Sequence, residues 1–172
     1  MCLKVFITGK PGSGKSTLVK EIVEELKKHG WRIGGILTPE VREHGYRLGF
    51  KVVDVASGNE AWLASVHIPT DKMVGKYYVN RKSFEKVAIP ALEYAIKECD
   101  LIVIDEIGKM EFISSKFKQI LERILSSDKC LLAVVHRSYA QKFRDYGEVY
   151  WLERDKFSKI KDEILEKFLK EA

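Results

Sequence analysis

Short apolar runs alternate with helical patterns along most of the chain. Apolar runs predict buried strands at residues 3–8, 31–38, 101–104, 131–135 and 149–152. Apolar side chains spaced three and four positions apart predict helices at residues 15–29, 83–98, 115–125, 139–144 and 157–169. Strands that alternate with helices are typical of an α/β fold, in which helices cover both faces of a sheet. We therefore predict three layers around a doubly wound, mostly parallel sheet.

A different pattern occupies residues 40–69. Extended runs at 46–55 and 60–66 are separated by turn residues at 43–45 and 57–59, which are typical of hairpins. We expect a small insertion of antiparallel hairpins here, within a single domain that spans residues 1–172. A chain of this length is ordinary for one domain.

Composition narrows the class of protein. The chain has 45% apolar and 32% charged residues, which is too apolar for a disordered protein. No apolar run approaches the roughly 20 residues of a membrane helix, and the first residues lack the features of a signal peptide. We therefore expect no membrane contact and a cytoplasmic location. The oligomeric state stays open, with a monomer favoured. The scarcity of asparagine and glutamine, beside many lysines and glutamates, is typical of proteins from thermophiles.

The cysteines favour a reducing compartment. Cys2, Cys99 and Cys130 are odd in number and widely spaced, and no two form a C-x-x-C pair. A disulfide and a zinc site are both disfavoured by this pattern. We expect all three cysteines to be small buried side chains.

A glycine-rich segment follows the first predicted strand and matches the phosphate-loop pattern G-x-x-x-x-G-K-[ST] at every fixed position. Glycines let the backbone turn its N–H groups toward a phosphate, and the helix that follows adds the positive end of its dipole. The lysine would reach the outer phosphates and the serine hydroxyl would bind Mg²⁺. The alternative is a turn that binds nothing. The predicted nucleotide-binding residues are Gly9, Lys10, Pro11, Gly12, Ser13, Gly14, Lys15, Ser16 and Thr17.

Two acids directly follow the most apolar predicted strand, which spans residues 101–104. Asp105 is the first polar residue after the run, where a carboxylate would face Ser16 across a bound Mg²⁺. Glu106 follows at once, and hydrolysis needs a carboxylate that orients a water and accepts its proton. The alternative for Glu106 is that it caps the next turn. The pair favours hydrolysis over transfer to an acceptor.

Another apolar strand ends in His136 and Arg137. If this strand lies beside the acidic one, His136 reaches the terminal phosphate, and Arg137 could neutralise charge there. The alternative is an ordinary strand end with a surface arginine. Lys109, Arg144 and the loop at 75–78 are weaker candidates, because each could be a solvated charge or a packing aromatic.

Together these stretches resemble the small nucleoside-triphosphatases of thermophilic archaea and bacteria, whose animal relative is the cancer-related nucleoside-triphosphatase. The resemblance covers essentially the whole chain. Its most specific part is the acidic segment, because this segment is not a general feature of phosphate-loop proteins. The matching stretches are GKPGSGKST at 9–17, GGILTPEVR at 34–42, GF at 49–50, VGKYYVN at 74–80, IDEIGKME at 104–111 and VVHR at 134–137.

The resemblance implies Mg²⁺-dependent hydrolysis of ATP, GTP, CTP and UTP to the diphosphate and phosphate, with broad base tolerance. It implies a recombinase-like sheet in which the strand at 131–135 separates the phosphate-loop strand from the acidic strand. It assigns water activation to Glu106 and the magnesium role to Asp105, and it favours His136 facing the nucleotide. Together with the candidates above, the catalytic residues would be Lys15, Glu106, His136 and Arg137, and Ser16 and Asp105 would hold the metal. A second nucleotide-contacting segment would comprise Val103, Ile104, Asp105, Glu106, Ile107, Gly108, Lys109 and Met110.

Two other functions remain open from the residues alone. The first is a small-molecule or nucleoside kinase, in which Arg137 and Arg144 belong to a closing lid and the insertion at 40–69 binds an acceptor. The second is a nucleotide-switched RNA-binding module. The net charge of +5 is modest and the lysines are spread along helices, which makes a nucleic-acid partner the weaker reading. The best local basic cluster is Lys72, Lys76, Tyr77, Tyr78, Arg81 and Lys82.

Overall fold

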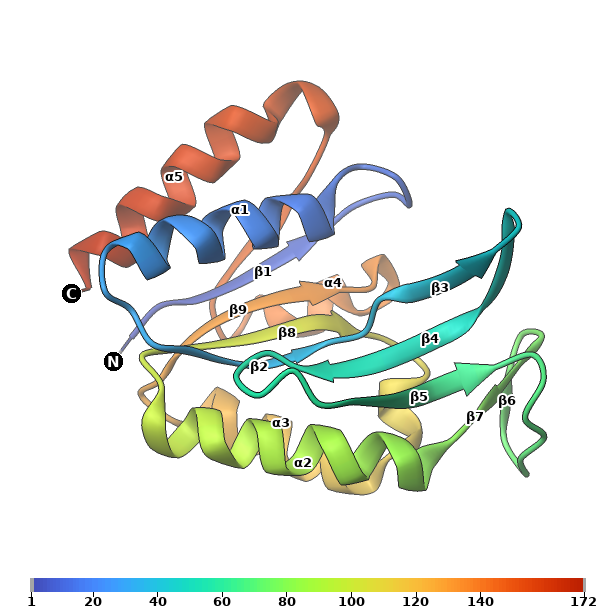
Figure 1. Cartoon of the computed structure of the whole chain (residues 1–172). Coiled ribbons are helices and arrows are strands. Elements are labelled where there is room, and N and C mark those ends of the chain that lie inside the picture. Colours follow the sequence, from blue (N-terminus) through green and yellow to red (C-terminus); the bar gives the residue numbers. More distant parts are fainter. Residues whose placement is uncertain (1, 172) are drawn as a thin grey trace.

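The computed structural model describes residues 2–171, and in this part of the chain one hydrogen-bonded sheet of ten strands forms the middle layer. Its parallel part confirms the predicted α/β class. Strand β9 (Cys130–Val135) lies between β1 (Lys4–Thr8) and β8 (Leu101–Ile107), as the resemblance to recombinase-type domains implied (Figure 1). In spatial order the parallel strands are β10 (Glu148–Trp151), β1 (Lys4–Thr8), β9 (Cys130–Val135), β8 (Leu101–Ile107) and β2 (Ile33–Leu37).

Helices cover both faces of the parallel part. Helices α1 (Lys15–Lys28) and α5 (Phe157–Lys170) lie on one face, and α2 (Arg81–Glu98), α3 (Ser115–Ser126) and α4 (Ala140–Phe143) lie on the other (Figure 1). Because successive side chains of a strand point to opposite faces, each strand supplies both cores. In β1, Val5 and Ile7 pack beneath α1 and α5, whereas Phe6 packs beneath α2 and α3. The three-layer prediction is confirmed.

Local capping sets the helix starts. The Asn80 side chain accepts a hydrogen bond from the Ser83 N–H at 3.0 Å, so α2 begins two residues before the predicted start. The Ser114 hydroxyl accepts one from the Phe117 N–H at 3.0 Å and begins α3. The helix predicted at 139–144 is instead a 3₁₀ turn followed by the single turn of α4.

The predicted insertion is larger than expected and is not a separate hairpin unit. It continues the main sheet, because β4 pairs antiparallel with β2. The predicted turns at 43–45 and 57–59 are present, but the antiparallel part extends beyond residue 69, since β7 pairs with β5 and buries Tyr77 and Val79. Its strands are β3 (Glu40–Glu43), β4 (Tyr46–Asp54), β5 (Glu60–Ser65), β6 (Met73–Val74) and β7 (Tyr77–Val79).

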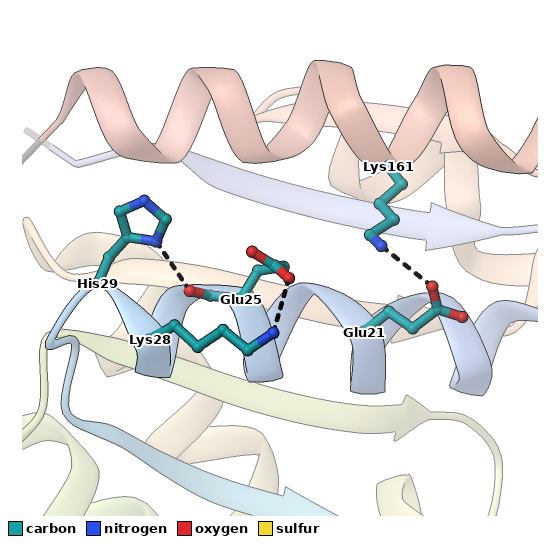
Figure 2. A network of polar contacts seen from close by, with 5 residues as sticks. All are labelled: Glu21, Glu25, Lys28, His29 and Lys161. Atoms are coloured by element: carbon teal, nitrogen blue, oxygen red, sulfur yellow. Dashed lines mark hydrogen bonds and ion pairs between the residues drawn. The ribbon is translucent and has the colours of Figure 1, made fainter.

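The lysine-rich helices are paired with acids at their surfaces, which fits their interpretation as solvated faces. Lys161 of α5 reaches Glu21 of α1 at 3.1 Å, and Lys28 reaches Glu25 at 3.3 Å (Figure 2). The His29 ring contacts the Glu25 carbonyl oxygen at 2.9 Å at the end of α1. Exposed pairs of this kind contribute only about 0–1 kcal/mol each. Among residues 2–171, no helix is long and apolar enough to cross a membrane.

The expectation that no disulfide forms is wrong for this structure. Cys2 and Cys130 are joined in a disulfide with their Cα atoms 4.7 Å apart, and Cys99 is free and buried. Cys2 precedes β1 and Cys130 begins β9, and these two strands are neighbours. Sequence spacing does not reveal this adjacency, because the two residues are 128 positions apart.

Candidate active site

The predicted site residues meet at one edge of the sheet. Parallel strands β1, β8, β9 and β2 end side by side, and the crevice beyond their carboxyl ends is where α/β proteins bind ligands. The glycine-rich loop follows β1, the acid pair ends β8, and His136 follows β9. Three separate stretches of sequence therefore contribute to a single site.

The phosphate loop has the strand–loop–helix context that its motif requires. It joins β1 to α1, whose first N–H groups lack partners within the helix and face the loop. Gly12 and Gly14 have φ values of +78° and +96°, which L-residues with a side chain rarely adopt. The motif therefore needs glycine at these two positions for backbone reasons.

Lys15 lies across the loop. Its Nζ donates to the carbonyl oxygens of Gly9 at 2.7 Å and Lys10 at 3.1 Å. Burial lowers the pKa of Lys15, and the nearby carboxylates of Glu106 and Asp105 oppose this shift. The ammonium group therefore stands between the loop and the acid pair.

Ser13 adds a second sign of an anion site. Its hydroxyl is buried in the loop and has no hydrogen-bond partner among the described residues. A buried hydroxyl without a partner costs roughly 1–3 kcal/mol. A phosphate oxygen held by the loop would supply the missing partner.

The acid pair lies against the phosphate loop. Asp105 is only 9% exposed, and burial raises the pKa of its carboxyl, while a hydrogen bond with Ser16 and the charge of Lys15 lower it. Burial also raises the pKa of Glu106, and the neighbouring Asp105 raises it further, while Lys15 opposes both. The peptide bond between the two acids is cis. The structure thus brings Ser16, Asp105, Glu106 and Lys15 together.

These residues suit Mg²⁺ better than a metal held by protein ligands alone. Ser16 and Asp105 offer two hard oxygen donors in mutual contact. Among residues 2–171, no group of three or more His, Cys, Asp or Glu side chains could hold a metal. Mg²⁺ is usually bound by one or two protein groups together with water and substrate phosphates.

Thr38 is a site residue that the motifs did not identify. It follows β2, and its hydroxyl donates to the Asp105 carbonyl oxygen at 3.0 Å and accepts from the Glu106 N–H at 3.0 Å. Thr38 thus fixes the backbone between the two acids. The signal in the sequence was a polar residue directly after a strand, and it indicates this role only once β2 is known to lie beside β8.

His136 and Arg137 reach the same edge. Partial burial of the ring lowers the pKa of His136, and the positive charges of Arg137, Lys15 and Lys109 lower it further, so three cations lie near it. The His136 Nδ1 lies 2.8 Å from the Ser138 hydroxyl. Both residues are exposed, which leaves them free to contact a ligand.

A cavity of about 460 Å³ extends from the acid pair toward the antiparallel strands. Lys109, Met110 and His136 line it together with the acids, and Glu40 and Phe50 supply the far wall. The antiparallel part of the sheet therefore builds one side of the site.

Not every predicted contact points into this cavity. The side chains of Ile104 and Ile107 pack in the core beneath α2 and α3, and Val103 packs on the opposite face. Only backbone atoms of the two isoleucines are available to a nucleotide. Lys10, Pro11 and Thr17 are exposed around the loop and the first turn of α1.

The structure gives less support to the lid expected of a kinase and to the basic cluster expected of an RNA-binding module. The segment proposed as a lid is anchored in the core, because Phe143 is 1% exposed and stacks on Phe6 with ring centroids 5.0 Å apart. In the basic cluster, Tyr77 is buried against Phe50 and Arg81 pairs with Glu85 at 2.8 Å. These contacts leave fewer groups free for RNA.

The chain is similar in sequence to known proteins along most of its length. A family model described as NTPase matches residues 4–165. Nucleoside-triphosphatase THEP1 of Methanocaldococcus jannaschii is 43% identical over 167 residues, which cover 97% of this chain and 98% of that protein. The namesake from Thermococcus kodakarensis is 43% identical over 175 residues, with 99% and 97% covered.

Two solved structures are similar in fold. The crystal structure of THEP1 from the hyperthermophile Aquifex aeolicus has a TM-score of 0.84 at 35% identity and covers 95% of this chain and 98% of that one. The solution structure of a human cancer-related nucleoside triphosphatase has a TM-score of 0.79 at 33% identity, with 96% of each chain covered. The similarity therefore extends over the whole domain.

Proposed function

The chain belongs to the NTPase family, and from this premise we propose that it is a nucleoside-triphosphate phosphohydrolase. It cleaves ATP, GTP, CTP and UTP to the diphosphate and phosphate in the presence of Mg²⁺. The observation that carries the proposal is that Lys15 of the phosphate loop lies near Asp105 and Glu106, the two acids that line the cavity. Phosphate binding and water activation are thereby provided side by side.

The triphosphate would be held by the loop after β1. Its N–H groups and the N-terminus of α1 suit the phosphate oxygens, and the unpartnered Ser13 hydroxyl adds a donor. Lys15, which donates to two carbonyl oxygens, would turn its Nζ to the β- and γ-phosphates, because a bond between two charged groups is stronger. All these contacts go to phosphates, which every nucleoside triphosphate shares, so base tolerance follows.

Ser16 and Asp105 would hold Mg²⁺ on the side of the phosphates that faces β8. The metal ion, when bound, supplies positive charge to the β- and γ-phosphate oxygens. The residues of the chain set its place, since Ser16 lies in the first turn of α1 and Asp105 is fixed by its backbone contact with Thr38.

Glu106 would be the general base. The water oxygen forms a bond to the γ-phosphorus, the bond from that phosphorus to the β–γ bridging oxygen breaks, and a water proton passes to the Glu106 carboxylate. Burial and the charge of Asp105 raise the pKa of Glu106, which makes the carboxylate a better proton acceptor than an exposed one. Arg137 and His136, which lie near Lys15, would neutralise or contact the charge that increases on the γ-phosphate.

A nucleoside or small-molecule kinase is the second candidate. Beyond Glu106 the cavity continues to Phe50 and Met110, which leaves space for an acceptor. Against this candidate stands Glu106 itself, since transfer to an acceptor does not require a base for water.

Phosphate release separates the two functions. We expect release from ATP, GTP, CTP, UTP and their deoxy forms at similar rates, unchanged by added nucleosides. Glu106→Gln should lower kcat by about 10²- to 10⁴-fold, the usual contribution of a general base, while a fluorescent ATP analogue still binds. Glu122→Gln, on the exposed face of α3, is the matched control and should behave as the wild type.

Three results would count against hydrolysis. Normal release from Glu106→Gln would remove that residue from the mechanism. A phosphorylated nucleoside, or release that depends on an added acceptor, would establish the kinase. A strong preference for one base would contradict broad tolerance and would require a base-reading site.

A further inference from the structure

Glu111 is a buried acid that the mechanism above does not use. It begins the 3₁₀ helix Glu111–Ile113 directly after β8 and is 4% exposed. Its Oε1 accepts a hydrogen bond from the Gly108 N–H at 3.0 Å. The Thr38 side chain lies near the carboxyl group and lowers its pKa. A buried acid with no structural partner of opposite charge is costly, and such groups are often functional.

The contacts of Glu111 lead to Glu106. A Cβ atom built on Gly108 would lie 3.2 Å from Glu111 Oε1 and 3.3 Å from Glu106 Oε1, so one backbone position is flanked by both carboxyl groups. On the other side, Thr38 joins the two, since it contacts Glu111 and accepts from the Glu106 N–H. Glu111 is thus tied to the Glu106 segment at two points, the backbone after it and the backbone before it.

The hydrogen bonds of Thr38 indicate whether Thr38 or Glu111 is the donor in the contact between the two side chains. The Thr38 hydroxyl has one hydrogen, which it donates to the Asp105 carbonyl oxygen. Toward Glu111 the hydroxyl is then an acceptor, and a carboxyl group can donate only when it is protonated. With the Thr38 hydrogen at Asp105, Glu111 fits its surroundings as a neutral acid that accepts from Gly108 and donates to Thr38. Thr38 would favour the carboxylate, and so lower the pKa, only by turning its hydrogen from Asp105 to Glu111, and burial outweighs this effect.

The charges around Glu111 agree with a neutral acid. Burial raises its pKa to about 8, and the nearby charge of Glu106 contributes to the shift. The other titratable or charged groups around the same cavity are Asp105, Lys109, Glu40 from β3 and His136 from the end of β9. A neutral Glu111 adds no negative charge behind the base.

We propose that Glu111 is a positioning residue of the hydrolytic site, which holds the Glu106 carboxylate in place through hydrogen bonds to the Gly108 N–H and the Thr38 hydroxyl. It touches neither the phosphates nor the water. The proposal rests on the role of Glu106 as general base. Loss of Glu111 would leave the base present but poorly directed.

Two variants of similar volume test this role. Gln at position 111 can accept from Gly108 and donate to Thr38 as the neutral acid does, whereas Leu can do neither. Each is compared with the wild type and with Glu122→Gln. The measurements are kcat and KM for ATP from pH 6 to pH 9, affinity for a fluorescent ATP analogue, and hydrogen exchange of the Gly108 N–H.

We expect Glu111→Leu to lower kcat at least about tenfold at pH 7 and to leave KM within about twofold, with faster exchange at Gly108. Glu111→Gln should retain kcat within about threefold. Ionisation of Glu111 places a second negative charge near the base, so the ratio of wild-type kcat to Glu111→Gln kcat should fall about tenfold from pH 7 to pH 9. A residue that only filled space would not change this ratio.

Two results would overturn the proposal. One is wild-type kcat and wild-type exchange in Glu111→Leu. The other is a ratio of wild-type kcat to Glu111→Gln kcat that does not change from pH 7 to pH 9. This second result would refute the proposal even if the leucine variant did not fold. A wild type that binds the ATP analogue but releases no phosphate would refute the proposed hydrolysis instead. In that case exchange at Gly108 still decides the contact, since equal rates in the two variants would contradict it.

Discussion

The buried carboxyl of Glu111 predicts a pH dependence of folding stability that a single substitution should remove. Its pKa is about 8 in the folded protein and about 4.5 in the unfolded chain. Between these two values the folded protein keeps a proton that the unfolded chain has lost. The protonated carboxyl therefore contributes its full stability below about pH 4.5, and this contribution is lost as pH rises toward 8.

The magnitude follows from linkage. A difference of one bound proton changes the free energy of unfolding by about 1.4 kcal/mol per pH unit. From pH 5 to pH 8 the wild type should lose up to about 4 kcal/mol from this group alone. Above pH 8 both states are ionised at Glu111 and the loss levels off.

Urea unfolding at pH 5, 6, 7 and 8 measures the effect. Other groups also titrate in this range, but they are shared by the wild type and Glu111→Gln, so the difference between the two isolates Glu111. For each pH unit from 5 to 8, we expect the free energy of unfolding of Glu111→Gln to rise relative to that of the wild type by about 1 kcal/mol or more. Glu122→Gln, whose side chain is exposed, should stay within about 0.5 kcal/mol of the wild type throughout.

Parallel stability curves for the wild type and Glu111→Gln would refute the reasoning. They would mean that Glu111 binds the same number of protons in the folded and unfolded states. A difference that grew toward low pH would reverse the sign and would indicate an ionised Glu111 stabilised by its donors.

Three further predictions concern other parts of the molecule. Phe143→Ala should lower the free energy of unfolding by about 3–5 kcal/mol, measured in urea, because it empties a fully buried site that stacks on a phenylalanine of β1. Ser16→Ala should weaken the apparent Mg²⁺ affinity for phosphate release by at least about tenfold, since the loss of even an outer-shell partner costs 10- to 100-fold; an unchanged Mg²⁺ dependence would exclude Ser16 as a ligand. Thiol titration of the unfolded, unreduced protein should detect Cys99 alone, whereas three thiols per chain would show that Cys2 and Cys130 are not paired.

The sequence predicted the parts of the fold that depend on local patterns. The apolar run at 101–104 corresponds to β8, and its first polar residues are the acid pair of the site. The phosphate loop is equally local, because its glycines, lysine and serine act through a turn of a few residues. Periodicity therefore placed both halves of the site at strand ends before any pairing was known.

Features that depend on which strands are neighbours could not be predicted in this way. Thr38 contacts the acid pair only because β2 pairs with β8. The link between Cys2 and Cys130 depends in the same way on β1 beside β9. Sequence patterns assigned Glu111 no role, because none of them shows that this acid, which begins the 3₁₀ helix after β8, is buried.

The antiparallel strands also determine where the sheet ends. Without β4, the outer edge of β2 would offer a row of unpaired N–H and C=O groups to any other chain. With the antiparallel strands present, that end of the sheet is β6, which is two residues long. Short edge strands offer little template for pairing between molecules. Deletion of residues 40–79 would therefore be expected to expose the edge of β2 and to promote aggregation through strand pairing between molecules. The strands that line the site thus also protect the sheet against aggregation.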